Sequence, residues 1–322
     1  MRTRPFAVPA LLFLITVLPR AVHSGNGHPG DLTGDNRVDP KDQFVISREW
    51  YNQARNNPVV SFVDPALETV ARALLKNVSG EIRARELGCI ESLQIPAGLD
   101  LNSLEDLQHF PALKNLLIQD PQPNDSSLDL APLALLEELN TLQIFRVDGT
   151  IQMTVDVTPL GTLENLTNLN LGGFEITGTS ALAGLTNLIE LEISNCELAD
   201  LSFVAGMEHL IALDVHGNTI THIAPLAALT ELRYLDLSLN NISNIMPLSQ
   251  LVNIQFLALG CNAITNIEPL VDNPGLGAGD RVFLAGGDNE LDDFSVNTLI
   301  PTLQARGVDV RYGGRVICIS FP

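Results

Sequence analysis

The 322-residue sequence is acidic, with 38 Asp and Glu residues against 18 Lys and Arg residues and a formal net charge of −20. This balance argues against nucleic acid or an anionic membrane surface as the partner, because both bind through basic faces. It is compatible with a well-solvated surface, a bound cation or a basic protein partner.

Residues 1–24 have the pattern of a secretory signal peptide. Two arginines precede an apolar run from Phe6 to Leu18, and the small residue Ser24 ends the segment. The run is too short to span a bilayer, so we expect it to be removed and the mature protein to be secreted or to lie at the cell surface or in the periplasm. No later run of 18 apolar residues and no L-P-x-T-G sorting signal follows. We therefore expect neither a membrane span nor sortase anchoring.

The segment 25–51 contains a twelve-residue acidic loop followed by a stretch typical of a helix. Oxygen ligands fall at loop positions 1, 3, 5, 7, 9 and 12, the spacing by which an EF-hand surrounds Ca²⁺. In this order they are Asp31, Thr33, Asp35, the backbone carbonyl of Arg37, Asp39 and Asp42. The spacing predicts a calcium site.

This loop and the stretch after it resemble one calcium-binding half of a dockerin, whose loops also carry Asp at position 12. The resemblance implies a cohesin-like docking partner, and a single loop implies weak affinity, with Kd of roughly 10⁻⁴ to 10⁻³ M. A dockerin has two such segments, whereas this sequence has one, and Thr33 and Asn36 depart from the usual pattern. The alternative is an Asp-rich tail that binds nothing.

The sequence predicts a polar linker over residues 52–62 and a helical cap over residues 63–86. Asp64 and Pro65 supply a helix N-cap and a first-turn proline. Apolar residues then recur at helical spacing: Leu67, Val70, Ala71, Leu74 and Leu75. An amphipathic helix here would cover the open edge of the repeat array that follows, because exposed end-repeats leave strands and core side chains in water.

Residues 87–285 consist of repeats of the form L-x-x-L-x-L. The regular copies open every 22 residues, at Leu166, Leu188, Leu210, Leu232 and Ile254. Three looser copies begin at Ile90, Leu113 and Leu139. Longer spacing among these early copies predicts that residues 120–127 and 148–156 loop out. Each unit is too small to bury its own apolar face and must stack on the next copy.

Within each unit, the L-x-L core predicts a short strand whose alternate side chains point into the stack. An Asn follows the strand in three copies, as Asn218, Asn240 and Asn262, where a buried amide can satisfy turn backbone groups. The return half, I-x-x-I-x-P-L, predicts short turns or one-turn helices. These motifs resemble the leucine-rich repeat family, and the return resembles its internalin-like bacterial subclass. The resemblance implies an α/β-type solenoid, a horseshoe with a parallel sheet on its concave side and short turns or 3-10 helices on its convex side.

Residues 286–322 predict a C-terminal cap and tail. A degenerate ninth strand is predicted from Val282 to Leu284. Beyond it, the stack is predicted to be closed by a helix that contains Leu299 and Leu303 and by a strand from Val308 to Val310. No position is predicted for residues 313–322.

Four cysteines leave three disulfide connectivities open. Cys196 and Cys261 lie three repeats apart, roughly 14 Å, beyond the reach of a disulfide. Cys196 takes the Asn position of its repeat, which predicts a buried thiol. A Cys261 to Cys318 bridge is one alternative for the others, and free thiols are the alternative that we prefer.

Strand residues that point away from the core should line up across repeats on the concave face. The alignment predicts an acidic stripe bordered by aromatic and histidine side chains. Its members are Glu190, Glu192, Asp214, His216, Tyr234, Asp236 and Phe256. Such a patch is suited to docking a protein or peptide, and the alternative is a merely solvated face. A metal site formed by His216 with Asp214 or Asp236 would need a further ligand.

No motif for catalysis is visible, because the sequence has no phosphate-binding glycine loop, no G-x-S-x-G and no H-E-x-x-H. We therefore predict a non-enzymatic, monomeric, exported binding protein. Two alternatives remain, a structural component of an extracellular assembly docked through the calcium loop and, with less support, a polysaccharide-binding protein.

Overall fold

The computed structural model describes residues 57–122, 127–146, 153–286 and 289–313. Two compact units divide the chain, residues 1–57 and residues 58–322, and the second contains nearly all of the described part. The predicted signal peptide, calcium loop and linker up to residue 56 lie outside the described residues. No helix within the described ranges is long and apolar enough to cross a membrane.

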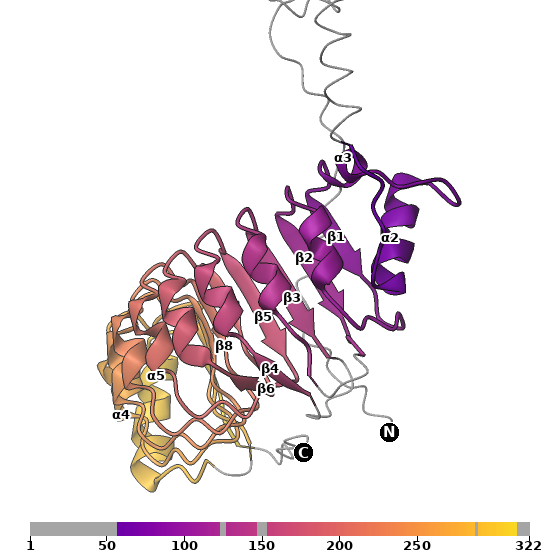
Figure 1. Cartoon of the computed structure of the whole chain (residues 1–322). Helices are drawn as coiled ribbons and strands as arrows, with labels where there is room; N and C mark the ends of the chain where they lie inside the picture. Colours follow the sequence, from indigo (N-terminus) through magenta and orange to yellow (C-terminus); the bar gives the residue numbers. More distant parts are fainter. Residues whose placement is uncertain (1–56, 123–126, 147–152, 287–288, 314–322) are drawn as a thin grey trace, which may run out of the picture. The chain divides into compact units, whose positions relative to one another are not determined.

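A ten-stranded parallel sheet forms the body of the second unit (Figure 1). Its strands follow chain order, except that β4 and β6 belong to a separate small sheet. The ten strands are β1 (Ser92–Ile95), β2 (Asn115–Gln119), β3 (Thr141–Phe145), β5 (Asn168–Gly172), β7 (Glu190–Glu192), β8 (Ala212–Asp214), β9 (Tyr234–Asp236), β10 (Phe256–Ala258), β11 (Arg281–Phe283) and β12 (Asp309–Arg311). The strands predicted at Val282 and Val310 are thereby confirmed as β11 and β12.

Short helical turns return the chain between strands. Within the described ranges, seven of them are 3-10 helices: η1 (Glu105–His109), η2 (Ala131–Leu135), η3 (Thr158–Thr162), η4 (Thr179–Gly184), η5 (Ser202–Gly206), η6 (Ala224–Ala228) and η7 (Met246–Gln250). Near the C-terminal end they are followed by α4 (Glu268–Asp272), the π-helical turn η8 (Ser295–Leu299) and α5 (Ile300–Ala305). The predicted leucine-rich repeat solenoid, with a parallel sheet and 3-10 turns on the return side, is confirmed.

The core is a continuous stack of aliphatic side chains between the sheet and the returns. In β9 and the residues after it, Leu235 and Leu237 are fully buried, and Ile242, Ile245 and Leu248 close the same layer from the return half. Neighbouring strands place equivalent leucines side by side, as in the pairing of Leu213 with Leu235. The alternation of buried and outward residues therefore repeats from strand to strand.

Buried asparagines hold the turns that leave the strands. Asn240 Nδ2 donates to the carbonyls of Val215 (2.9 Å) and Leu237 (3.1 Å), while its Oδ1 accepts from the backbone N–H of Ile220. Asn218 and Asn262 make the equivalent bonds, which confirms the predicted role. A fourth member, Asn289, was not predicted; it bonds Leu259 and Leu284 in the same way.

A cap covers the N-terminal end of the stack. Helix α2 (Pro65–Leu75) lies beside β1 (Figure 1), and the short helix α3 (Ala84–Leu87) follows it. The buried carboxylate of Asp64 accepts from the N–H of Ala66 and of Leu67 at the start of α2. Its other oxygen accepts from the backbone N–H groups of Asn102 and Ser103. The predicted N-cap is confirmed, and it also joins the helix to the first repeat.

The insertion before the fourth repeat is more ordered than predicted. Its last residues form strand β4 (Thr154–Asp156), which pairs in parallel with β6 (Glu175–Thr177). The prediction that residues 148–156 only loop out is therefore wrong at their C-terminal end. Met153, Val155 and Val157 are buried there, and this alternation of apolar residues favours a strand over an open loop.

The cysteines differ from the preferred prediction at one position. Cys261 is disulfide-bonded, so the expectation of a free thiol is wrong there. Its partner lies outside the described residues, as does Cys318. Cys89 and Cys196 are free. Cys196 is buried and donates from Sγ to the carbonyls of Leu171 and Ser194, both at 3.1 Å, so it replaces an Asn as predicted.

Candidate partner-binding face

Parallel pairing brings the predicted surface residues into rows that cross the sheet. Strand partners place Glu192, Asp214 and Asp236 side by side on β7, β8 and β9. A second row runs Glu190, Ala212, Tyr234, Phe256. The predicted rows are confirmed, because each strand contributes a residue from the same place in its repeat.

The acidic row is completed by His216, just beyond the end of β8. His216 Nδ1 lies 2.7 Å from Asp214 Oδ1, which also accepts from the His216 backbone N–H at 3.0 Å. Asp236 Oδ1 accepts in the same way from the backbone N–H and hydroxyl of Ser238. Each aspartate is thus fixed by the residue two positions later.

Crowding of like charges at a half-buried surface changes the acid–base behaviour of this row. Burial and the neighbouring Asp214 raise the pKa of Glu192. Burial and Asp214 also raise the pKa of Asp236, against the opposing effect of its hydrogen bonds from Ser238. Burial by itself lowers the pKa of His216, but the hydrogen bond to Asp214 and the surrounding carboxylates outweigh it and raise that pKa to about 9. The carboxylates around His216 therefore favour its cationic form.

Aromatic side chains border the acidic row on its C-terminal side. The rings of Tyr234 and Phe256 stack with centroids 4.7 Å apart and an interplanar angle of 4°. Phe283 continues the surface, with its ring centroid 5.1 Å from that of Phe256. Burial raises the pKa of Tyr234, and nearby carboxylates add to the effect, so its hydroxyl stays protonated. The three rings form what we call the aromatic platform.

Sequence analysis missed Phe283 and two arginines beyond it. Phe283 lies in register with Ala258 on β10 and with Arg311 on β12, and Arg281 lies in register with Phe256. The signal was present, because the apolar pair Val282 and Leu284 places Phe283 on the outward side of its strand. The face therefore changes from acidic on β7 to β9, through aromatic, to mixed charge on β11 and β12, where Asp309 lies in register with Arg281 and forms an ion pair with Arg311 at 3.2 Å.

Three groups in the acidic row lie close enough to share a cation. Ligand atoms of Asp214, His216 and Asp236 lie within 4.8 Å of one another. However, one oxygen of each aspartate and the imidazole Nδ1 are already hydrogen-bonded, and the remaining ring nitrogen of His216 lies 3.2 Å from Asn195 Nδ2. A metal ion could bind this imidazole only after displacing a proton from it. An organic cation can bind the carboxylates while the existing hydrogen bonds stay in place, so the arrangement favours an organic cation.

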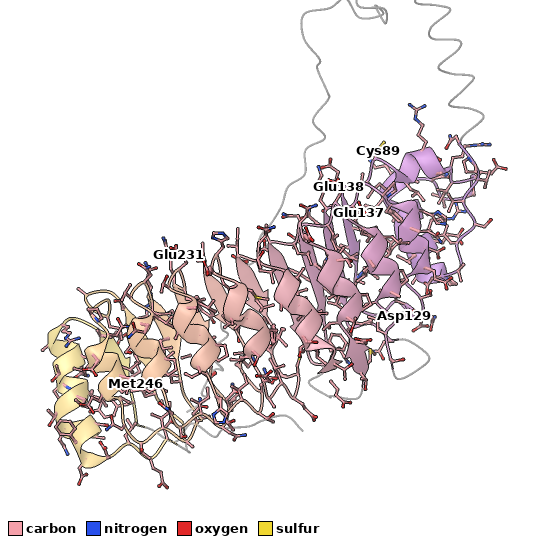
Figure 2. The ribbon with its side chains drawn as sticks, turned by 60° about the vertical axis from the view of Figure 1, so that its left-hand side comes forward. Cys89, Asp129, Glu137, Glu138, Glu231 and Met246 are labelled. Carbon is pink, nitrogen blue, oxygen red and sulfur yellow. The ribbon has the colours of Figure 1, made fainter. Side chains whose placement is uncertain are left out.

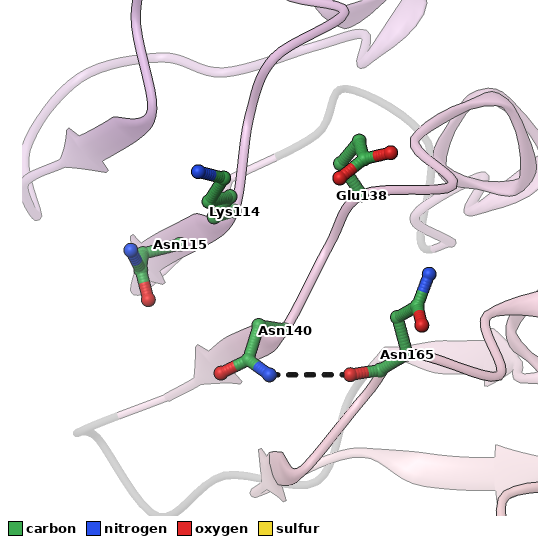
Figure 3. Close-up of a pocket in the computed structure, with 5 residues that line it drawn as sticks. All are labelled: Lys114, Asn115, Glu138, Asn140 and Asn165. Atoms are coloured by element: carbon green, nitrogen blue, oxygen red, sulfur yellow. Dashed lines mark hydrogen bonds between the residues drawn. The ribbon is translucent and has the colours of Figure 1, made fainter. Parts of the chain in front are cut away.

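A polar hollow of about 350 Å³ lies at the other end of the array, where the chain enters the early strands (Figure 3). Its lining residues are Lys114, Asn115, Glu138, Asn140 and Asn165. Asn140 Nδ2 donates to the carbonyl of Asn165 at 3.2 Å. The hollow lacks an aromatic side chain on which a sugar ring would stack, so it gives little support to polysaccharide binding.

Exposed side chains also lie away from the outward rows of the sheet. Figure 2 shows Met246 on η7 and Glu231 in the loop before β9, and both are exposed. Single exposed apolar residues are ordinary on protein surfaces. These two residues serve below as controls for substitutions on the concave face. The predicted calcium ligands from Asp31 to Asp42 lie outside the described residues.

Solved structures share this architecture. Internalin C2 of Listeria monocytogenes aligns with 78% of this chain and 94% of its own, at 25% sequence identity and a TM-score of 0.51. The Listeria monocytogenes protein InlP aligns with 77% of this chain and 69% of its own, at 19% identity and a TM-score of 0.59. The chain has the leucine-rich repeat fold.

A more distant neighbour is the leucine-rich repeat ectodomain of the Arabidopsis thaliana receptor kinase GASSHO1/SCHENGEN3, solved with CASPARIAN STRIP INTEGRITY FACTOR 2. It aligns over 72% of this chain and 28% of its own, at 15% identity and a TM-score of 0.52. No protein-family profile and no curated protein matches the chain. At these identities the comparisons establish the fold, and the function must be argued from the surface.

Proposed function

We propose that this chain is an exported, non-enzymatic protein that recognises a protein or peptide partner on its concave face. The observation that carries the proposal is the adjacency of the acidic row to the aromatic platform on consecutive strands. Aromatic side chains that are held rigidly and are partly exposed are typical centres of binding energy, and charged groups beside them select the partner and its orientation. The resemblance to internalin-like proteins supports export and a protein partner.

The test compares partner capture by four variants of the mature chain. Tyr234→Ala and Asp214→Lys alter the concave face, whereas Met246→Ala and Glu231→Lys make similar changes away from it. Proteins captured from the producing organism's surface fraction are identified by mass spectrometry. We expect one species to be lost with both concave variants and kept with both controls, with all four variants folded by circular dichroism. Capture that is unchanged by Tyr234→Ala and Asp214→Lys would contradict the proposal.

A second proposal concerns the predicted calcium loop. We propose that Asp31, Thr33, Asp35, the carbonyl of Arg37, Asp39 and Asp42 bind Ca²⁺ weakly and dock the chain to a cohesin-like module of an extracellular assembly. Support comes from the EF-hand spacing of these oxygens. Calorimetric titration of Ca²⁺ should show saturable binding that Asp31→Ala/Asp35→Ala removes. Absence of binding at millimolar Ca²⁺ would refute the metal site, and retention in the assembly after deletion of residues 31–51 would refute docking.

A further inference from the structure

On the basis of the proposed function, one side chain of the partner can be inferred from the place where the stacked rings of Tyr234 and Phe256 end. Phe256, Tyr234 and Ala212 occupy the same register position on β10, β9 and β8. Glu190 is the next residue of this row, on β7. Alanine therefore stands where a third stacked ring would lie, and a carboxylate follows it.

The geometry of the two rings shows which surface of Tyr234 is directed toward β8. Parallel rings whose centroids are only 4.7 Å apart overlap face to face, because rings lying edge to edge in one plane would be further apart. Their separation is close to the strand spacing of about 4.8 Å, so the ring faces look along the row, across the strands. Phe256 covers one face of Tyr234, and the opposite face is directed over Ala212. Both Tyr234 and Ala212 are partly exposed.

The register leaves room for one flat group beside this free face. Strands β7 and β9 lie two strand spacings apart, or about 9.6 Å. A flat group midway between them, over the methyl side chain of Ala212, would lie about as far from Tyr234 as Phe256 does on the other side. The methyl group is too short to fill this position itself, whereas a large side chain at residue 212 would fill it.

Carboxylates border the position over Ala212 on two sides. Glu190 lies in register on β7, and Asp214 lies two residues further along β8, on the same face of the sheet. One oxygen of Glu190 accepts from Asn168 Nδ2 at 2.6 Å. Asp214 uses Oδ1 for its bonds with His216. The second oxygen of each carboxylate accepts no hydrogen bond from the described part of the chain, so a group bound here would meet two free acceptors.

Between β5 and β10, no basic side chain of the described residues shares the row of Glu190. His216 offsets part of the charge of Asp214, but it does so from the opposite side of that carboxylate. Arg233 is exposed just before β9, at a position that alternates away from the outward row. Arg281 lies three strands away on β11, in register with Asp309. The position over Ala212 therefore keeps a negative surrounding.

A guanidinium matches this combination of a ring face and two carboxylates. It is flat and cationic, it stacks on aromatic faces, and its fork of N–H donors pairs with carboxylates. A lysine ammonium supplies the charge without the flat surface, and a phenyl ring supplies the flat surface but removes water from the carboxylates without replacing its hydrogen bonds. We propose that the partner places an arginine side chain over Ala212, where its guanidinium stacks on the free face of Tyr234 and binds the two carboxylates.

The test selects random ten-residue peptides displayed on phage against the full mature chain and measures the affinity of the selected peptides by calorimetry. We expect the tightest binders to share an arginine. Its replacement by citrulline, which keeps the flat shape but has no charge, should weaken binding by at least about tenfold. Its replacement by lysine, which keeps the charge but not the flat shape, should weaken binding by about threefold or more.

Variants of the chain test the position itself. Ala212→Phe fills it while keeping Tyr234 and every carboxylate, and should weaken binding by at least about tenfold. Tyr234→Leu should also weaken binding, and Tyr234→Phe, which keeps a ring, should bind about fivefold more tightly than Tyr234→Leu. Glu190→Gln/Asp214→Asn should weaken binding by at least about tenfold, whereas Glu231→Gln, the control for charge, should not.

The outcomes distinguish failure of this inference from failure of the proposed function. Peptides that require Tyr234 but tolerate citrulline, or that bind Ala212→Phe as tightly as the native chain, would overturn the inference and leave the concave face as a binding surface. If no selected peptide depends on Tyr234 or Asp214, both the inference and the proposed function fail. Thermal unfolding verifies that each variant is folded, and Tyr234→Leu decides the matter if Ala212→Phe is not.

Discussion

His216 Nδ1 lies 2.7 Å from Asp214 Oδ1, at the point where β8 ends and three carboxylates from neighbouring strands meet. The imidazole orients Asp214 and, when protonated, offsets part of the repulsion between Glu192, Asp214 and Asp236. An acidic row at one register position of a parallel sheet would otherwise oppose the stacking of its own repeats. His216 therefore links the charge of the acidic row to the stability of the fold.

The first prediction is a pH-dependent loss of stability that originates at His216. Its pKa is raised to about 9 in the folded chain, above roughly 6.5 in an unfolded one. The stabilisation is thus complete below about pH 6.5 and is lost as pH rises through about 9, by roughly 1 to 3 kcal/mol. Urea unfolding at pH 6 and pH 9.5 should show this decrease in the native chain and a smaller one in His216→Gln.

His222, which is exposed on the next repeat, provides the matched control. His222→Gln should keep the full pH dependence of the native chain. The raised pKa values of Glu192 and Asp236 have the same sign, since their contribution also falls as pH rises through the folded pKa, but they act at lower pH. An undiminished decrease between pH 6 and pH 9.5 in His216→Gln would refute the assignment to this histidine.

The second prediction concerns the asparagine ladder. Asn240→Ala removes the acceptor of the buried Ile220 N–H and one of the two side-chain donors to each of the carbonyls of Val215 and Leu237, which Asn218 and Asn262 also bond. A buried polar group that loses its partner costs about 1 to 3 kcal/mol, so the free energy of unfolding should fall by about that amount. Asn241→Ala, one position later and exposed, should change it by less than about 0.5 kcal/mol. Equal effects of the two substitutions in urea unfolding would contradict the role of the ladder.

Much of the fold follows from the sequence because the repeat constrains it. Once Leu235 and Leu237 are assigned to one strand, the outward position of Asp236 is fixed, and the same rule places Asp214 and Tyr234. The acidic row and most of the platform could therefore be predicted before any coordinates. The periodicity in effect supplies the register of a parallel sheet, which is otherwise difficult to predict.

Features that depend on irregular segments could not be predicted in this way. The pairing of β4 with β6 joins residues of two different returns, and no repeat position marks it. Phe283 lies 25 residues after Ala258, its strand partner, whereas the regular repeat is 22 residues long. The repeat period therefore does not predict its position. The disulfide at Cys261 depends on where a tail without repeat pattern lies.

The third prediction tests how the cap is joined to the array. Asp64 is 1% exposed, and its carboxylate accepts four backbone N–H groups, two from α2 and two from the segment before η1. Asp64→Ala should lower the free energy of unfolding by about 2 to 4 kcal/mol, more than the loss of an ordinary N-cap, because both segments lose acceptors. Glu68→Ala, within α2, should have a much smaller effect. Hydrogen exchange should show early opening of residues 65–75 in Asp64→Ala, and protection equal to that of the native chain would argue against this junction.

The fourth prediction uses a backbone position that the repeats fill in different ways. Leu239 has a φ of 56°, in the left-handed region, at the position occupied by Gly217 and Asn195 in the two preceding repeats. A left-handed conformation costs most residues roughly 1 to 2 kcal/mol, and Asn tolerates it better than Leu. Leu239→Asn should therefore raise the free energy of unfolding by about 0.5 to 1 kcal/mol, whereas Gly217→Ala should lower it, because a Cβ there would clash with Asn195 Oδ1. The free energy of unfolding of both variants is measured in guanidinium. If Leu239→Asn is less stable than the native chain, the prediction is wrong, and the leucine side chain stabilises this turn by more than its backbone strain costs.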